Sequence, residues 1–271
     1  ATRTLLRDGA IVAVKGLGGF HLACDATNAA AVAELRRRKL RVGKPFAVML
    51  PDLAAARRHC VLSPAEEELL LSRARPIVVA RRRADSTIAA EVAPEQSTIG
   101  IMLPYTPLHH LLLERAPGFP EALVMTSANL SEEPIAHTNE AARERLAGLA
   151  DAFLFHDRDI HTRCDDSVMR VVEEETRDST DLSEERRSFG AASGMERRSH
   201  ALPLRRARGY APYPVRLPWA GSPLLAVGAE LKNTFCLTRD DYAFLSHHIG
   251  DLENYETLPA FEDGVAHLER L

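Results

Sequence analysis

Short apolar runs alternate with amphipathic stretches along the first two thirds of the chain. The runs have the length of buried strands and lie at residues 11–14, 46–50, 76–80, 99–103, 122–126, 152–155 and 167–172. Helical spacing of apolar positions, or a helix-start signal, predicts helices at residues 28–38, from Ser63, at 107–115 and at 139–149. At Ser63 the order Ser-Pro-Ala-Glu provides an N-cap, a proline in the first turn and a glutamate at its third position. Because strands and helices alternate without a strict βαβ repeat, we expect an α/β domain around a twisted, mixed sheet.

The pattern changes twice in the last third of the chain. Residues 173–200 are charged, rich in serine and poor in large apolar side chains, which predicts a flexible surface insertion without a catalytic role. Apolar runs at 224–227 and 234–238 then predict a β-hairpin that opens a second domain. We therefore assign residues 1–218 to a first domain and residues 219–271 to the start of a second. Some fifty residues are too few for a complete core, so we expect the second domain to be truncated and the chain to be a fragment.

Composition narrows the class of protein. The chain has 271 residues and a net charge of -4, so it has no general attraction to nucleic acid, and any anion site must be local. Cys24, Cys60, Cys164 and Cys236 are scattered without a paired motif, which favours reduced thiols over disulfides or a zinc cluster. The chain lacks an apolar stretch long enough for a membrane span and a signal-peptide pattern, so we expect a cytoplasmic protein without a membrane partner.

Two segments have the residue types of an anion-binding site. An apolar run leads into the turn at 15–19, Lys-Gly-Leu-Gly-Gly, and a second apolar run leads into Thr-Ser-Ala-Asn-Leu-Ser at 126–131. Glycines and small hydroxyl residues after a strand expose main-chain N–H groups to which a phosphate can bind. The simpler interpretation is that Ser127 and Asn129 cap the turn that follows them.

Between these segments lies a strongly basic stretch. Residues 36–44 contain six cations and directly precede the apolar run at 46–50. Fixed positive charge at the mouth of a buried strand can hold a polyphosphate. Taken alone, the stretch is more typical of a solvated basic helix end, and only its combination with the two segments favours an anion site.

These motifs, in this order, resemble a known family. Residues 15–26, 36–49, 103–109, 126–131 and 165–168 are similar to the YrdC-like domain of HypF-type carbamoyltransferases. Residues 205–212, 228–235 and 246–254 resemble the passage of such proteins into their kinase-like (ASKHA) transferase domain. The resemblance covers nearly the whole chain. It implies a YrdC-like α/β domain followed by the first strands of the transferase domain.

The resemblance also implies a chemistry. The substrate would be carbamoyl phosphate or carbamate. Carbamate would attack the α-phosphorus of ATP with the help of Mg²⁺ and give carbamoyl-adenylate and pyrophosphate. In the complete protein the carbamoyl group would pass to the C-terminal cysteine of a HypE-type maturation protein, as a precursor of the cyanide ligands of [NiFe]-hydrogenase. Such a displacement depends on charge neutralisation and orientation more than on a covalent protein group.

The motifs assign residues to this chemistry. Catalytic roles are expected for Lys15, Arg38, Lys39, Ser127 and Asn129. Nucleotide-binding roles are expected for Gly18, Gly19, Arg41, Lys44, Ser131, Arg206 and Arg208. The polar stretch at 156–166 lacks metal-ligand spacing, and we expect a loop that lines the cleft, with Asp165 or Asp166 orienting the cations. Glu132 departs from the family pattern, which has glycine there, and adds negative charge beside the expected phosphate site. We assign no role to His247 and His248.

Two other functions remain open. YrdC-like domains also make threonylcarbamoyl-adenylate for tRNA modification, and some bind double-stranded RNA through a basic concave face. The segment at 20–25 and the continuation after residue 220 favour the hydrogenase-maturation branch, so a nucleic-acid partner is not expected. A non-catalytic binding module would show no dependence on ATP.

Overall fold

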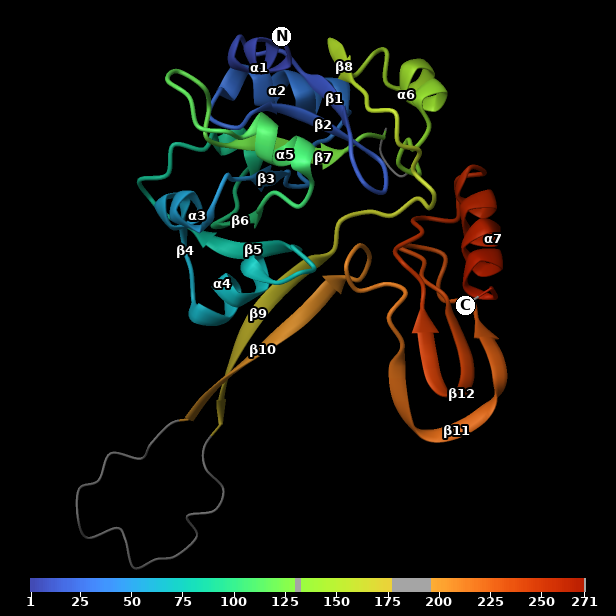
Figure 1. Cartoon of the computed structure of the whole chain (residues 1–271). Coiled ribbons are helices and arrows are strands. Elements are labelled where there is room, and N and C mark those ends of the chain that lie inside the picture. Colours follow the sequence, from blue (N-terminus) through green and yellow to red (C-terminus); the bar gives the residue numbers. More distant parts are fainter. Residues whose placement is uncertain (130–132, 177–195, 271) are drawn as a thin grey trace, which may run out of the picture.

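A large mixed sheet forms the body of the protein (Figure 1). The computed structural model describes residues 1–129, 133–176 and 196–270. The strands of this sheet are β1 (Val12–Lys15), β2 (Phe20–Asp25), β3 (Ala47–Met49), β4 (Cys60–Val61), β5 (Ile77–Arg82), β6 (Thr98–Met102), β7 (Leu123–Ser127), β8 (Ala152–Leu154), β9 (Val168–Thr176) and β10 (Glu196–Arg205). Their order is β10-β9-β5-β6-β3-β7-β2-β1-β8, with β4 paired to β5. Because β3–β6, β5–β9 and β1–β8 are parallel and the other pairs antiparallel, the predicted mixed sheet is confirmed.

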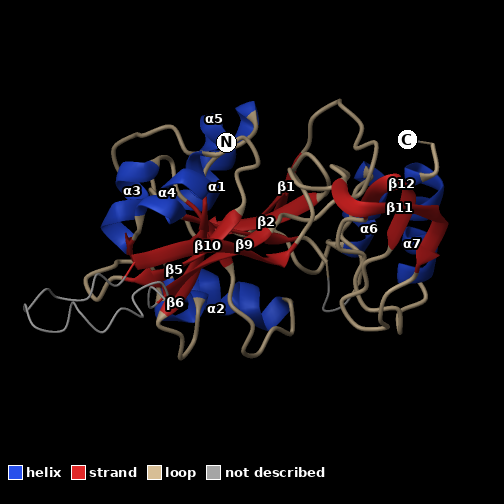
Figure 2. Ribbon diagram, turned by 90° about the horizontal axis from the view of Figure 1, so that it is seen from below, coloured by secondary structure: helices blue, strands red, loops and turns tan. Residues whose placement is uncertain are grey.

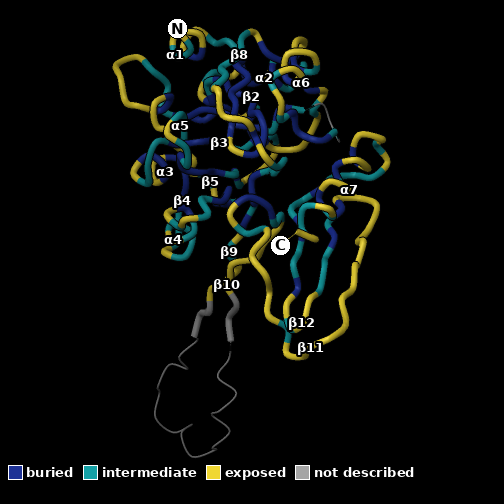
Figure 3. Tube along the Cα trace, turned by 45° about the vertical axis from the view of Figure 1, so that its right-hand side comes forward, coloured by how far each residue is buried: buried dark blue, intermediate teal, exposed yellow. Residues whose placement is uncertain are grey.

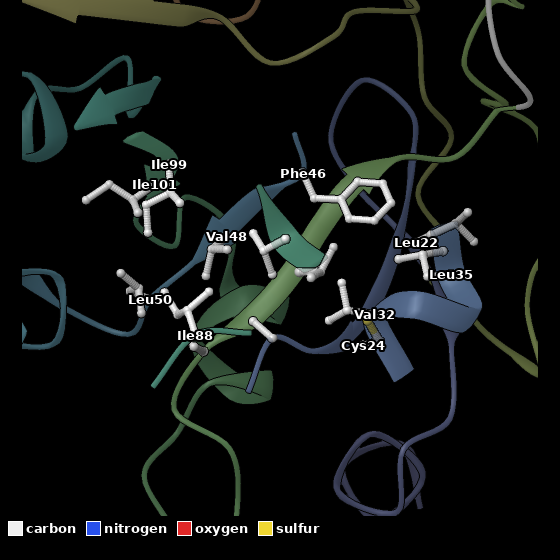
Figure 4. Close-up of a cluster of buried hydrophobic side chains, with 14 of the residues drawn as sticks. Leu22, Cys24, Val32, Leu35, Phe46, Val48, Leu50, Ile88, Ile99 and Ile101 are labelled. Atoms are coloured by element: carbon white, nitrogen blue, oxygen red, sulfur yellow. The ribbon is translucent and has the colours of Figure 1, made fainter. Parts of the chain in front are cut away.

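Helices cover both faces of this sheet (Figure 2). They are α1 (Thr2–Arg7), α2 (Ala29–Arg38), α3 (Leu53–His59), α4 (Pro64–Leu71), α5 (Pro107–Leu112), α6 (Asn139–Arg145) and the 3₁₀ turn η1 (Ala90–Val92). One face packs against α2, α3, α4 and α6 in a core that includes Val32, Val48 and Ile101 (Figure 4). The other face carries Met49, Met102 and Met125 and packs against α1 and α5. The apolar residues divide between these two cores because successive side chains of a strand point to opposite faces of the sheet.

Local signals placed several elements correctly. The Ser63 hydroxyl accepts the Glu66 N–H at 3.3 Å and a Glu66 carboxylate oxygen accepts the Ser63 N–H at 2.7 Å, so the expected capping box forms. Asn28 caps α2 through the Ala31 N–H. Strand β2 was not predicted; its buried Phe20 and Leu22 follow directly on the glycine turn. Helices α1 and α3 and strands β4 and β10 were not predicted either.

The two ends of the segment 173–200, predicted as a flexible insertion, are strands in the structure. Strand β9 continues to Thr176 and β10 begins at Glu196. The two strands pair from Thr176↔Glu196 inward to Val168↔Arg205, with a register shift between Pro203 and Arg205. They leave the body as a long hairpin (Figure 1). The polar composition of these residues did not indicate a strand. A strand at the edge of a sheet can expose both of its faces to solvent while the neighbouring strand provides its main-chain hydrogen bonds. The middle of the predicted insertion, residues 177–195, lies outside the described residues.

The last part of the chain forms a second, smaller unit. Strands β11 (Val215–Ala226) and β12 (Cys236–Leu245) make a two-stranded antiparallel sheet, and α7 (Thr257–Leu268) packs on it through Phe235, Ile249 and Ala260. The predicted hairpin is confirmed, with Leu224 opposite Thr238, and its first strand begins nine residues earlier than expected. The predicted domain boundary at 218–219 falls within β11. Figure 3 shows how exposed β11 is compared with the central strands of the body.

None of the helices in the described parts of the chain is long and apolar enough to cross a bilayer.

Candidate functional site

Two cavities adjoin each other on the body, and the second unit closes one of them. We call the first, of about 180 Å³, the cationic cavity. Its lining includes residues 39–44, Ser127, Asn129, Arg163, Asp165 and Arg205 from the body and residues 247–251 from the second unit. We call the other, of about 250 Å³, the sheet cavity. Its floor is the part of the sheet that α1 and α5 leave open, with Ala47, Ile77, Val79, Gly100, Met125 and Val168.

Lys39 is the most deeply buried cation of the cationic cavity. It follows the last turn of α2, and its side chain is only 2% exposed. Its ammonium group donates to the main-chain carbonyl of Ser127 at 2.8 Å, to the carbonyl of Asn129 and to the Asn129 side-chain oxygen at 3.2 Å. Burial, and then repulsion by Arg41, lowers the pKa of Lys39 to about 7. The basic stretch therefore contains a buried amine that changes charge near neutral pH.

Arg41 and Arg205 lie on both cavities. The Arg41 guanidinium donates to the carbonyls of Lys44 at 3.0 Å and Pro45 at 2.6 Å and lies over the Phe46 ring at 4.9 Å. These contacts hold the loop between α2 and β3 in a tight curve with its cations toward the cavities. Arg205, at the end of β10, lies 3.6 Å from an Asp165 oxygen.

The loop after β7 supplies the hydroxyl and amide groups. The Ser127 hydroxyl donates to the Asn129 side-chain oxygen at 2.9 Å, and the Asn129 amide donates to the Glu133 carbonyl at 2.5 Å. Both residues line the cationic cavity. These bonds shape the loop, as the simpler interpretation expected, and at the same time the loop supports Lys39. Glu133 itself is paired with Arg145 at 2.8 Å.

A buried ion-pair network borders the sheet cavity. Asp166 accepts hydrogen bonds from His21 Nε2 at 2.8 Å and from Arg208 Nε at 2.7 Å. The Arg208 guanidinium also donates to the carbonyls of Ala74 and Arg75 and lies 3.4 Å above the Tyr105 ring. Burial alone would raise the pKa of Asp166, but attraction by Arg208 and the bond from His21 hold it well below the usual range. Asp166 is thus a fixed anion that anchors β9 and the segment after β10.

The second unit closes the cationic cavity with histidines. His247 and His248 follow β12 and line it together with Arg163 of the body. Burial lowers the pKa of each histidine to about 4, and for His248 the charge of Arg205 adds to the effect. At neutral pH both are therefore uncharged, so the positive charge of this cavity comes from lysine and arginine.

The structure brings together five of the predicted site residues and separates six others. Lys39, Arg41, Lys44, Ser127 and Asn129 line the cationic cavity. The remaining described candidates line neither cavity: Lys15, Gly18, Gly19, Arg38, Arg206 and Arg208. Ser131 and Glu132 lie outside the described residues.

Each separated cation has a partner elsewhere. The Lys15 ammonium donates to the His156 carbonyl at 3.1 Å. Arg38 forms ion pairs with Glu34 at 2.7 Å and Asp151 at 2.8 Å on the outer side of α2. Arg206 donates to three main-chain carbonyls between 2.6 and 3.0 Å, including that of Leu245 at the end of β12. Consecutive residues of a helix or strand point in different directions, which a count of charges along the chain does not resolve.

The predicted glycine turn has a packing role in this structure. A Cβ at Gly18 would overlap the carbonyl oxygen of Cys164, and one at Gly19 would lie 2.5 Å from Cδ1 of Ile135. The Cys164 N–H also donates to the Gly18 carbonyl at 2.9 Å. The glycines therefore let the loop that carries Asp165 pack closely on the turn.

Several residues that line the cavities were not predicted from the sequence. Arg205 lines both cavities although Arg206 and Arg208 were chosen, and His247 and His248 were assigned no role. Asp165 was considered only together with Asp166. The signal for Arg205 was present in the same arginine-rich segment, but only the register of β10 selects it.

Other reactive groups offer no second site in the described residues. Among them, no group of three or more histidine, cysteine or acidic side chains could hold a metal ion. Burial raises the pKa of the Cys60 and Cys164 thiols to about 12, which makes them poor nucleophiles.

Comparison with known proteins assigns the two units to families. The Sua5/YciO/YrdC family model, described as telomere recombination, matches residues 4–178. A model described as the HypF Kae1-like domain matches residues 220–271.

Relatives agree with both assignments. The chain is 47% identical to carbamoyltransferase HypF2 of Cupriavidus necator over 98% of its own length and 32% of that protein. A crystal structure of full-length HypF in the phosphate- and nucleotide-bound form superposes with a TM-score of 0.85 at 44% identity, covering 100% of this chain and 38% of that one. Threonylcarbamoyl-AMP synthase of Mus musculus is 33% identical over 47% of this chain and 45% of its own length.

The chain thus spans about a third of the length of the first of these relatives. The resemblance that the motifs predicted is confirmed. The chain belongs to the Sua5/YciO/YrdC family, in the form that continues into a HypF Kae1-like domain.

Proposed function

We propose that this chain carries the carbamoyl-activating site of a HypF-type carbamoyltransferase. In this proposal, carbamate attacks the α-phosphorus of ATP, and carbamoyl-adenylate and pyrophosphate are formed. Magnesium enters as part of the Mg–ATP substrate and bridges phosphate oxygens. In the longer protein the carbamoyl group then passes to the C-terminal cysteine of a HypE-type partner, toward the cyanide ligands of [NiFe]-hydrogenase.

One observation carries the proposal: a cavity lined by lysine and arginine adjoins a cavity with an apolar floor. ATP has the matching division, with a polyanionic end and an aromatic, largely apolar base. Lys39, Arg41 and Arg205 would neutralise phosphate charge, while the sheet cavity would take the nucleoside. The related full-length HypF was crystallised in a phosphate- and nucleotide-bound form, which supports a nucleotide-binding site in proteins of this kind.

The chemistry needs little more from the protein than this arrangement. Displacement at phosphorus proceeds when nucleophile, phosphorus and leaving group are held in line and the negative charge is balanced. Fixed cations in a partly closed cavity are suited to this because they do not have to reorganise during the reaction. Buried Lys39 supplies the most desolvated of these charges once it is protonated.

Calorimetric titration with Mg–ATP tests the binding step. We expect Arg205→Ala to weaken binding at least about tenfold, since a charge-assisted contact contributes about 1.5–3 kcal/mol. Arg38→Ala is the matched control, because Arg38 carries the same charge but pairs with Glu34 and Asp151 outside the cavities. Equal weakening by both variants, or the absence of ATP binding by the folded chain, would contradict the proposal.

Pyrophosphate exchange tests the reaction and the main alternative together. The threonylcarbamoyl-adenylate function is favoured by the match to threonylcarbamoyl-AMP synthase over 129 residues. We expect ATP–pyrophosphate exchange that depends on carbamate and not on L-threonine with bicarbonate, and no binding of a short RNA duplex. Threonine-dependent exchange would support the alternative, and ATP binding without any exchange would support a binding module.

A further inference from the structure

The two cavities meet at a small set of shared residues. Five residues line both: Arg41, Lys44, Ser127, Asp165 and Arg205. On the proposed function, on which this inference rests, the nucleoside occupies the sheet cavity and the outer phosphates the cationic cavity. The α-phosphate is the group between them, so it lies at this junction. The attacking carbamate must lie there too, because bond formation requires its oxygen about 3–3.5 Å from the phosphorus.

Asp165 differs in charge from the cationic residues at the junction. A carboxylate beside a phosphate is repelled by it, whereas Arg41, Lys44 and Arg205 attract it. The other carboxylates of the cationic cavity are engaged elsewhere, since Glu133 pairs with Arg145 at 2.8 Å and Asp251 accepts the Lys232 N–H at 2.5 Å. Phosphate binding therefore does not account for a carboxylate at this position, and Asp165 must have a different function.

The carboxylate of Asp165 has hydrogen-bonding capacity to spare. Its contact with Arg205 is 3.6 Å, beyond hydrogen-bond length, and its side chain is 20% exposed. Its backbone is fixed by the Arg208 N–H, which donates to the Asp165 carbonyl at 3.0 Å. Neighbouring Asp166 is in contrast fully engaged by His21 and Arg208. Asp165 thus presents a rigidly mounted acceptor at the junction.

The NH₂ group of carbamate needs such a hydrogen-bond acceptor, whereas the methyl group of acetate does not. Carbamate and acetate have the same charge and nearly the same shape, but carbamate has an NH₂ group where acetate has a methyl group. The cationic side chains at the junction only donate hydrogen bonds. The Ser127 hydroxyl donates to Asn129 and offers only a neutral acceptor oxygen, so among the five shared residues the charged acceptor is Asp165. We propose that Asp165 accepts a hydrogen bond from the carbamoyl NH₂ group and so selects carbamate over acetate.

The reaction step is compatible with this contact. A carboxylate oxygen of carbamate forms a bond to the α-phosphorus, and the bond from that phosphorus to the bridging oxygen breaks. Pyrophosphate leaves with the electron pair of the broken bond. The NH₂ group keeps both protons, so its hydrogen bond to Asp165 persists from substrate to adenylate. The contact therefore determines specificity without taking part in proton transfer.

The test compares two stable analogues of the acyl-adenylate. They are adenosine 5′-O-sulfamates that bear an N-carbamoyl or an N-acetyl group and differ only by NH₂ against CH₃. We expect the unmodified chain to bind the carbamoyl analogue about 10–100-fold more tightly, as for a hydrogen bond to a charged group. In Asp165→Leu this ratio should fall to about one, and Asp165→Asn, which keeps an acceptor oxygen, should retain part of it. Asp159→Leu, exposed in the same loop, is the matched control and should keep the full ratio.

The outcomes separate this inference from the proposed function. If both analogues bind the unmodified chain equally well, or if Asp165→Leu keeps the ratio, the inference is wrong while the nucleotide site stands. If neither analogue binds, the nucleotide site and the inference both fail. Circular dichroism confirms that each variant is folded, and Asp165→Asn provides the readout if Asp165→Leu is not.

Discussion

Lys39 provides the sharpest quantitative prediction, because its charge depends on whether the cationic cavity is filled. Burial lowers its pKa to about 7 from the ordinary value of 10.5. Near pH 8 about nine tenths of the Lys39 amines are therefore neutral in the ligand-free protein, and near pH 6 only about one tenth. Binding of Mg–ATP would place negative charge beside this amine and raise its pKa.

The magnitude follows from these fractions. If phosphate returns the pKa of Lys39 to near its ordinary value, the bound state is fully protonated at both pH values. Binding then takes up about 0.9 proton per site near pH 8 and about 0.1 near pH 6. By linkage, proton uptake means that the affinity for Mg–ATP decreases as the pH rises above about 7.

Calorimetry in buffers with different ionisation enthalpies measures this uptake. The slope of the observed binding enthalpy against buffer ionisation enthalpy equals the number of protons exchanged. Lys39→Arg is the matched control, because arginine keeps its charge throughout this range and should bind without uptake. A slope near zero for the unmodified chain near pH 8, or an equal slope for Lys39→Arg, would refute the reasoning.

Three further predictions concern the framework around the site, and urea unfolding measures all of them. Gly18→Ala should lower the free energy of unfolding by about 1–3 kcal/mol, because its methyl group would overlap the carbonyl oxygen of Cys164; an unchanged midpoint would contradict the close packing. Asp166→Asn should lower the free energy of unfolding by about 3 kcal/mol or more, because buried Arg208 loses its ion pair. Since the pKa of Asp166 is depressed in the folded state, the stability that this ion pair contributes should be present above about pH 4 and lost below it. The folded pKa of His247 is about 4, below the ordinary 6.5, so stability should fall by on the order of 2 kcal/mol as the pH drops through this interval, and His247→Gln should reduce that slope.

Much of the framework could be predicted from local signals. The apolar runs correspond to β1, β3, β5, β6, β7 and β8, and Ser63 and Glu66 form the capping box that their spacing indicates. Each such signal depends on residues within one turn or one strand. Strand β10 escaped prediction because its partner β9 lies some twenty residues or more away in the chain. A polar sequence reveals an edge strand only when that partner is known.

The sequence predicted five of the residues that line the cationic cavity and missed others, among them Arg205. Motifs grouped Lys39, Arg41 and Lys44 with Ser127 and Asn129, and the structure places all five on one cavity. The two groups of residues come together because each follows the end of a helix or strand, and these ends lie at the same edge of the sheet.

The sequence by itself determined the family, the alternation of strands and helices, and the basic stretch that lines one cavity. Only the tertiary structure decided that Arg205 and Asp165 lie at the junction while Arg38 and Arg206 point away. The physical reason is that the direction of a side chain depends on strand register and on partners far along the chain. Residue Asp165 stands where it does because Cys164 packs on Gly18, more than a hundred residues before it.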